Sequence, residues 1–277
     1  TYYARHDGEP EAVAEAIHEQ YLPRFAGDEI PRTSTGLAIA LADRLDTLTG
    51  IFGIGQRPTG AKDPFALRRA TIGVLNILIK GELDLDLREL LELAASQHRD
   101  LPKAEGLVDD VLTYMLDRFR AWAQDEALPV DVYLAVRARP VTRPLDFARR
   151  LRAVHRFGQR EEAAALAAAN KRVSNILSKQ QHDGSIEVNG DLLAEEAEIA
   201  LANAVSDCRN QVEPLFREAE YTQALDILAT LRAPVDHFFD DVMVAVEDDA
   251  VRANRLALLA GLQALFLEVA DIAELQS

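Results

Sequence analysis

Two aspartates, Asp43 and Asp46, have the residue type and spacing that most directly suggest chemistry. They stand three residues apart in the string ALADRLD, and residues at that spacing share one face of a helix. With the doublet His6-Asp7 they could hold a divalent metal ion for phosphate hydrolysis. A metal site must be complete to hold its ion, and no companion histidine stands beside the doublet. The structural alternative is that the two carboxylates pair with nearby arginines or cap backbone.

A glycine-rich turn, GIFGIGQRPTG over residues 50–60, follows these aspartates. It contains Gly-x-x-Gly-x-Gly, but it follows an expected helix and lacks a lysine–serine ending. Neither a dinucleotide-binding loop nor a P-loop is therefore indicated. The basic residues in and after the turn are Arg57, Lys62, Arg68 and Arg69. They could place a phosphate at the N-terminus of the next helix, contact nucleic acid, or form a solvated surface.

Arginines concentrate between Arg137 and Arg160, where eight arginines face a single acid, a net charge of +7. Arg149, Arg152, Arg156 and Arg160 recur at helical spacing and share one helix face. Planar guanidinium groups suit the phosphates of an RNA backbone. The alternative is that this face docks against the protein's own acidic helices.

The string AAANKRVSNILSK, residues 167–179, is also informative. Val173, Ile176 and Leu177 are expected to pack inward. The polar residues left for the opposite and flanking faces are Lys171, Arg172, Asn175 and Lys179. Asparagine beside arginine suits the reading of base edges in unpaired RNA, although Asn175 could instead satisfy buried backbone groups.

The composition bounds the fold that must position these residues. The 277-residue chain is 48% hydrophobic and 27% charged, with few aromatics, and alanine and leucine dominate, which predicts an all-α globular protein. A net charge of −16 argues against general polyanion binding, DNA included, so an RNA site must be local. The single cysteine, Cys208, fits a reducing cytoplasm. No apolar run reaches the ~20 residues of a membrane span.

Helical periodicity and chain breakers predict the elements. A helix should begin at Thr33 or Ser34 and end near Thr49, and Asp63 should cap the next, with Pro64 at its first position. The other helices are expected over 9–19, from about 86, and over 107–125, 145–157, 161–178, 191–219, 221–232, 234–246 and 250–272. Prolines 129, 140 and 144 are expected to break the chain between them.

Taken together, the strings resemble the beta subunit family of bacterial tetrameric (α2β2) glycyl-tRNA synthetases. The most specific one is IFGIGQ followed by KDPFALRRA. The matching stretches run in the family's order over essentially the whole chain: YYARHDGE (2–9), YLPRFAGDEIP (21–31), ALADRLDTLTGIFGIGQRPTGAKDPFALRRATIGVLNIL (40–78), RFRAWAQDE (118–126), AAANKRVSNIL (167–177), FFDDVMV (238–244) and RLALLAGLQALFLEVADIAELQ (255–276).

The resemblance implies a C-terminal part of such a subunit, and the start at Thr1 without methionine agrees with a piece of a longer chain. The implied domains are the remainder of an HD-like helical domain (1–96), a helical linker region (97–144) and an anticodon-binding helical bundle of the arginyl-tRNA synthetase type (145–277). The implied partners are tRNA(Gly) and the alpha subunit, in the cytoplasm. Catalysis, ATP and Mg would belong to the alpha subunit, so no catalytic residue, metal or cofactor is expected in this fragment.

The function expected from sequence is therefore tRNA binding for ATP-dependent glycylation by a partner subunit. The candidate tRNA-binding residues are Lys171, Arg172, Asn175, Lys179, Arg149, Arg152, Arg156, Arg57, Lys62, Arg68 and Arg69. Two alternatives stay open at this point. One is a metal-dependent phosphohydrolase of the HD type that uses His6, Asp7 and Asp43, and the other is a helical assembly scaffold.

Overall fold

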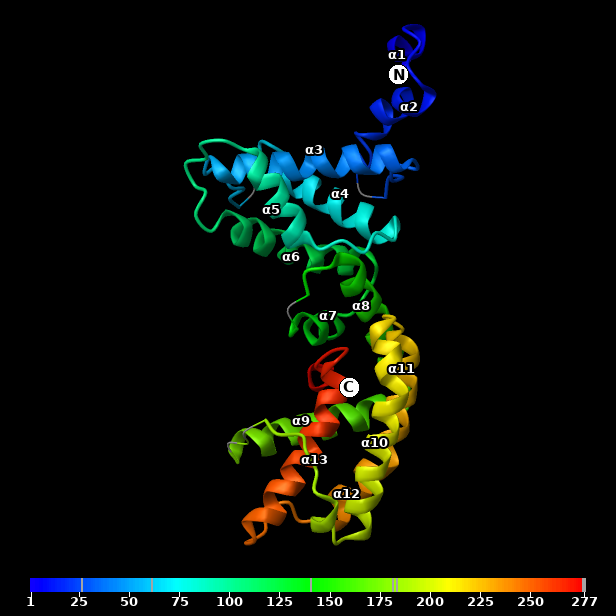
Figure 1. Cartoon of the computed structure of the whole chain (residues 1–277), viewed down its shortest axis with the longest axis vertical. Coiled ribbons are helices and arrows are strands. Elements are labelled where there is room, and N and C mark those ends of the chain that lie inside the picture. The colour runs from blue at the N-terminus through cyan, green and yellow to red at the C-terminus, as the bar shows by residue number, and fades with distance from the viewer. Residues whose placement is uncertain (26, 61, 140, 181, 183, 276–277) are drawn as a thin grey trace. The chain divides into compact units, whose positions relative to one another are not determined.

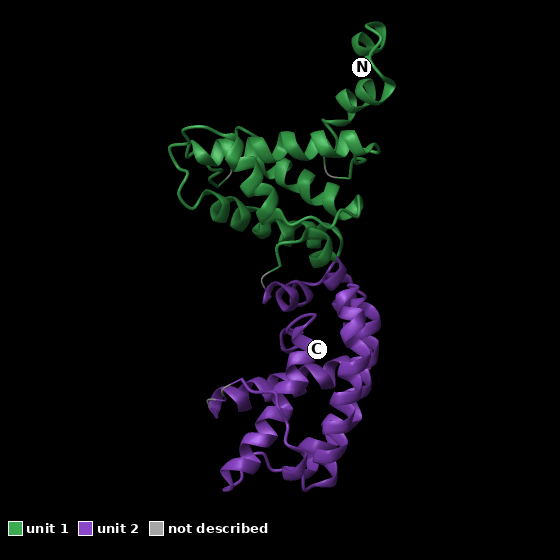
Figure 2. Ribbon diagram, viewed as in Figure 1, with its two compact units in different colours: residues 1–127, 141–148 green, residues 128–140, 149–277 purple. Residues whose placement is uncertain are grey.

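The computed structural model describes residues 1–25, 27–60, 62–139, 141–180, 182 and 184–275. The described chain is all α-helical, as the composition predicts, with an isolated bridge between Thr59 and Lys62 and no strand (Figure 1). It divides into two compact units (Figure 2). The first consists of residues 1–127 and 141–148, and the second of residues 128–140 and 149–277.

The first unit is organised around one long helix, α3 (Ser34–Gly53). It packs against α2 (Glu11–Glu19), α4 (Leu67–Lys80), α5 (Leu87–Gln97) and α6 (Leu107–Asp125). The short helix α1 (Tyr2–His6) packs on α2. Helix α6 lies in the segment expected to be a linker, and its Met115 and Phe119 are buried in this unit. The expected functional domain limits stay a prediction.

Helix α3 begins where the sequence predicts and ends later. The Thr33 side chain caps it by accepting a hydrogen bond from the Gly36 N–H at 3.0 Å. The expected end near Thr49 is wrong, because the helix continues through Gly50 to Gly53. These glycines serve close packing: a Cβ at Gly53 would lie 2.7 Å from the side chain of Leu101.

A buried arginine fixes the loop before α3. Arg44 is 9% exposed and donates hydrogen bonds to the carbonyl oxygens of Gln20, Tyr21, Pro23 and Ala40. Burial lowers the pKa of its guanidinium. Because Arg44 binds carbonyl groups, it does not serve as the partner of the neighbouring aspartates.

The second unit contains α9 (Ala163–Lys179), the helix that carries the predicted polar residues. Its other helices are α7 (Val130–Arg137), α8 (Pro144–Gly158, whose first residues belong to the first unit), α10 (Glu196–Arg217), α11 (Tyr221–Leu228), α12 (Arg232–Asp241) and α13 (Asp249–Leu267), with short 3-10 turns η1 (Gly190–Leu192), η2 (Ala229–Leu231) and η3 (Ile272–Glu274). Helix α10 packs on α11 and α12, and α9 contacts α12, α13 and η3. Gln263 of α13 donates a hydrogen bond to Ser174 of α9 at 2.5 Å.

Several details of this unit differ from the sequence-based expectation. Helices α10, α12 and α13 end at Arg217, Asp241 and Leu267, earlier than expected, and α10 begins at Glu196 and not at 191. Helix α7 was not predicted, because Pro129 reads as a breaker, yet this proline sits at the N-cap, where its missing N–H costs nothing. Helix α13 is long and apolar enough for a membrane span by composition. However, 61% of that window is buried inside the protein, as in the core helix of a globular domain.

Candidate nucleic-acid interface

The four polar residues predicted on α9 occupy one solvent face of that helix. Lys171, Asn175 and Lys179 follow one another at single-turn spacing, and Arg172 lies beside them. All four side chains are exposed, while Val173 is fully buried. The sequence therefore placed these polar residues correctly. Ile176 and Leu177, which were expected to pack inward with Val173, are only half-buried.

Asn175 and Asn170 have different roles. Asn170, 2% exposed, donates a hydrogen bond to the Leu166 carbonyl oxygen at 2.9 Å. Asn175 is exposed, and its amide has no hydrogen-bond partner among the described residues. The alternative that Asn175 satisfies buried backbone is thus wrong, and its amide is available to a ligand.

Two hollows of similar size border this face of α9. One, about 550 Å³, is lined by Lys171, Ser174 and Asn175, with Asp271 and Glu274 on the far side. The other, about 510 Å³, is lined by Arg172, Ile176, Lys179, Phe239, Asp240, Asp241 and the loop to Ala245. Each hollow therefore combines a cation with carboxylates, which accept hydrogen bonds from base amino groups.

Arg172 stacks on an aromatic ring. Its guanidinium carbon lies 4.1 Å from the centre of the Phe239 ring, and Phe239 packs edge-on against buried Phe238. Such a cation–π contact holds the guanidinium plane in a fixed orientation. A flat, oriented guanidinium beside an aromatic ring is a surface on which an unpaired base can stack.

A buried ion pair holds the loop that closes the second hollow. Arg255 of α13 donates to the Glu198 carboxylate and, at 2.6 Å, to the Met243 carbonyl oxygen. Glu198 also accepts from the N–H groups of Ala194 and Glu195 at the start of α10. Burial alone would raise the pKa of Glu198, but these hydrogen bonds outweigh it and lower the pKa below 4.5.

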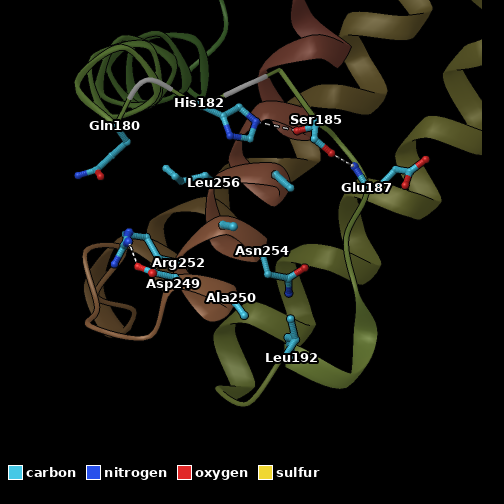
Figure 3. Close-up of a pocket in the computed structure, with 12 residues that line it drawn as sticks. Gln180, His182, Ser185, Glu187, Leu192, Asp249, Ala250, Arg252, Asn254 and Leu256 are labelled. Carbon is cyan, nitrogen blue, oxygen red and sulfur yellow. Dashed lines mark hydrogen bonds and ion pairs between the residues drawn. The ribbon is translucent and has the colours of Figure 1, made fainter.

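A third hollow, about 540 Å³, lies at the C-terminal end of α9. Figure 3 shows His182 pointing to Ser185 and Arg252 pointing to Asp249, each within its own segment. Asn254 of α13 also lines this hollow, and its amide exchanges two hydrogen bonds with the backbone of Asn189. These two bonds hold Asn189 against α13.

The predicted arginine face is divided. Arg160 lies beyond the end of α8 at Gly158, so the prediction that it shares one helix face with the other three arginines is wrong. Arg160 binds the acids Glu162 and Asp226, as the docking alternative expected. Arg149, Arg152 and Arg156 are exposed. Arg149 and Arg156 have no acidic partner among the described residues. Arginines elsewhere in the +7 window, such as Arg139, donate to backbone carbonyl groups of the same unit.

Two of the four basic residues in and after the glycine-rich turn form contacts within the first unit. Arg57 pairs with Asp110 and lies 5.6 Å from the ring centre of Phe52, and Arg68 donates to the Gly60 carbonyl oxygen. Lys62 and Arg69 are exposed and have no side-chain partner in the described part of the chain. They are the cations of this turn that remain for an external ligand.

The phosphate site considered at the start of α4 is already filled. The helix begins at Leu67, so the prediction that Pro64 is its first residue is wrong. The Asp63 carboxylate accepts from the N–H groups of Leu67 and Arg68 at 2.8 and 3.0 Å. Asp63 therefore occupies the position that an anion would take.

The candidate metal ligands do not form a site. His6, Asp7, Asp43 and Asp46 are all exposed, and no group of three His, Cys, Asp or Glu side chains comes together among the described residues. Asp46 instead lies 3.3 Å from Nε2 of His98. The phosphohydrolase alternative gains no support from this arrangement.

His98 is a residue that the sequence did not single out. Its Nε2 lies 3.0 Å from the Thr49 hydroxyl, and a Cβ at Gly50 would lie 3.1 Å from its ring. The contact joins residues 49 positions apart, so no local spacing could have revealed it. It fastens the end of α5 to α3.

Comparison with known proteins agrees with the sequence resemblance. Residues 1–138 match the family described as glycyl-tRNA synthetase beta subunit, and residues 166–272 match the DALR anticodon binding domain. The chain is 77% identical over 276 residues to the glycine–tRNA ligase beta subunit of Chromohalobacter salexigens, with 100% of this chain and 40% of the relative covered. It is 57% identical to the subunit of the same name from Haemophilus influenzae, with 99% and 40% covered.

A third relative with this name, from Hahella chejuensis, is 54% identical over 277 residues, with 100% of this chain and 40% of the relative covered. The chain thus spans about two fifths of the length of the curated relatives it matches. The polar face of α9, and the helix from residue 166 onward, lie within the segment matched by the anticodon-binding domain. The chain belongs to the glycyl-tRNA synthetase beta subunit family.

Proposed function

We propose that this chain is the tRNA-binding portion of a glycine–tRNA ligase, and that the second unit binds the anticodon loop of tRNA(Gly) on α9. The observation that carries the proposal is the solvent face of α9, where Lys171, Arg172, Asn175 and Lys179 stand between two hollows. This face lies in the segment that matches an anticodon-binding domain.

The geometry suits unpaired RNA. Lys171 and Lys179 would neutralise phosphates, and Asn175 would hydrogen-bond to a base edge. The Arg172–Phe239 pair offers a stacking surface, and Asp240 beside it can accept from a base amino group. An unpaired loop exposes base edges and faces together, whereas duplex RNA hides them.

The rest of the proposed assignment follows from the family. The partner would be the alpha subunit, which would bind ATP and Mg and catalyse glycylation in the cytoplasm. This chain would then supply no catalytic residue and no cofactor. Lys62 and Arg69 of the first unit would contact the acceptor side of the tRNA or the alpha subunit, because their charges have no partner among the residues that the structure describes.

Affinity for tRNA(Gly), measured by filter binding or fluorescence anisotropy near physiological salt, tests the site. Arg172→Ala and Asn175→Ala should each weaken binding by roughly 5- to 100-fold, the range for one lost base contact. Arg217→Ala and Asn203→Ala on α10 are matched controls, since both residues are exposed and line neither of the hollows beside α9.

The control on selectivity is a set of transcripts with altered anticodons. Altered anticodons should bind more weakly to the unchanged protein than tRNA(Gly) does. Equal affinity for tRNA(Gly) and an unrelated tRNA would favour the assembly scaffold. Unchanged binding in both α9 variants would refute the site.

A further inference from the structure

A smaller hollow lies between α7, α8 and α9, at a place that none of the sequence motifs indicated. Its volume is about 180 Å³. Val132 of α7, Ala163 of α9 and Leu275 near the C-terminus give it apolar walls. A cavity of ~150 Å³ is enough to hold one benzene-sized ring. This hollow therefore has room for a single six-membered ring.

Polar groups stand at the edge of this apolar space. His155 of α8 and Gln159, the residue directly after the end of α8, both line it, and their side-chain nitrogens lie 3.3 Å from each other. Asp131 of α7 is the third polar side chain of the lining. The carboxamide of Gln159 can both donate and accept hydrogen bonds. Apolar walls with a few convergent polar groups are the usual lining of a ligand pocket.

The hollow is continuous with the polar face of α9. It shares Ala164, Ala167 and Leu275 with the hollow that Lys171 and Asn175 line. Arg156 follows His155 directly on α8 and is exposed, with no acidic partner among the described residues. A strand of RNA that follows the α9 face could thus enter the small hollow from the hollow that Lys171 lines, and Arg156 is a further exposed cation on the helix that carries His155.

We infer that the hollow between α7, α8 and α9 holds one unpaired single-ring base, a pyrimidine, and that Gln159 and His155 bind its edge. The inference rests on the proposed function, because the RNA must already lie along α9. Alanines 163, 164 and 167 leave room for the ring against the helix, since each carries only a methyl group. The second ring of a purine would not fit inside this volume and would extend into the adjoining hollow, out of reach of an edge contact with Gln159.

The test combines protein variants with modified tRNA(Gly) transcripts. Each unpaired pyrimidine of the anticodon loop is replaced, one at a time, by an abasic residue, and affinity is measured for the unchanged chain, Gln159→Leu and the control Gln211→Leu. Gln211 is an exposed glutamine of α10 outside this hollow. Gln159→Glu, nearly the same size, serves as a second variant that removes the amide donor.

In the unchanged chain and in Gln211→Leu, one abasic position should weaken binding by roughly 5- to 100-fold. In Gln159→Leu the intact transcript should already bind more weakly, and the same abasic replacement should add little. Gln159→Glu should also weaken the intact transcript. A purine at the sensitive position should weaken binding to the unchanged chain.

Equal abasic losses in Gln159→Leu and the unchanged chain, at every position, would overturn the inference. Full affinity for the purine transcript would overturn the single-ring assignment. Lys171→Ala in the same series separates this inference from the proposed function. If Lys171→Ala weakens binding while the abasic replacement costs as much affinity in Gln159→Leu as in the unchanged chain, only the base pocket is refuted. If neither variant nor any transcript change alters binding, the proposed function fails as well.

Discussion

Replacing Arg255 with methionine should destabilise the second unit by about 3–5 kcal/mol, the cost of leaving one member of a buried ion pair without its partner. The side chain of Glu198 is 0% exposed and that of Arg255 7% exposed. The substitution also removes the hydrogen bond from Arg255 to the Met243 carbonyl oxygen. The loop beside the hollow of Arg172 should therefore open more often.

The pH dependence of the stability should reverse in this variant. In the unchanged protein the pKa of Glu198 is lowered, so its ion pair stabilises the fold above pH 4.5 and that stabilisation is lost as the pH falls through the folded-state pKa. Without Arg255, burial dominates and raises the pKa of the Glu198 carboxyl. Arg255→Met should then gain stability from this group as the pH falls and the carboxyl becomes protonated.

Hydrogen exchange followed by mass spectrometry, on peptides of α10 and α13, measures the opening free energy of this unit separately from the first. The double variant Glu198→Gln/Arg255→Met removes the unpaired charge and should recover part of the loss. Arg217→Met is the control: its pair with Glu213 is exposed, so its effect should stay within ~0.5 kcal/mol.

Two results would refute this reasoning. One is a double variant less stable than Arg255→Met, which would show that the charge left on Glu198 is not the source of the cost. The other is Arg255→Met losing stability between pH 7 and pH 4 to the same extent as the unchanged protein.

Three further predictions concern the site and the fold. Lys171→Ala and Lys179→Ala should each reduce the slope of log affinity for tRNA(Gly) against log salt concentration by about 1, because each removes one phosphate contact. Titration at several salt concentrations measures this slope. Arg156→Ala should reduce the same slope by about 1, whereas Arg160→Ala, whose side chain is held by Asp226, should leave it unchanged; equal effects would contradict the division of the arginine face. Gly36→Ala should destabilise the first unit in thermal unfolding, because the added Cβ would lie 2.0 Å from Oε2 of buried Glu19. This clash should outweigh the helix preference of alanine over glycine, which is ~1 kcal/mol. Gly158→Ala is the control and should be neutral or stabilising, since nothing lies within 4 Å of its added Cβ.

The sequence predicts well what depends on local pattern. Helix α6 has the expected limits, 107–125, because an unbroken apolar stripe lies between Gly106 and the polar residues around Asp125. The α9 face is predicted correctly for the same reason. Buried Val173 fixes the orientation of the helix, and the polar residues must then face solvent.

The sequence predicts poorly what depends on contacts between distant segments. The predicted end of α3 is wrong because glycines such as Gly53 usually end a helix in sequence-based prediction. In the structure Gly53 is needed for close packing against Leu101, a contact between distant residues that no local pattern reveals. Arg160 looks identical to Arg156 in the helical repeat, and its partner Asp226 lies 66 residues away. The contact between His98 and Thr49 is of the same kind.

The acidic character of the chain and its proposed RNA site are compatible, because charge acts locally at physiological salt. Exposed charges farther apart than about 8 Å are largely screened at physiological salt. The net charge of −16 therefore weakens the general attraction of the chain to RNA, but it has little effect on local contacts between RNA and the α9 side chains. Carboxylates line the same two hollows as the cations. A phosphate chain that strays from Lys171 and Lys179 would meet Asp240 or Glu274 and be repelled, while a base amino group at the same place would be bound. Acids beside the cations would thus disfavour duplex nucleic acid, which presents mainly phosphates, and favour an unpaired loop, which presents bases as well.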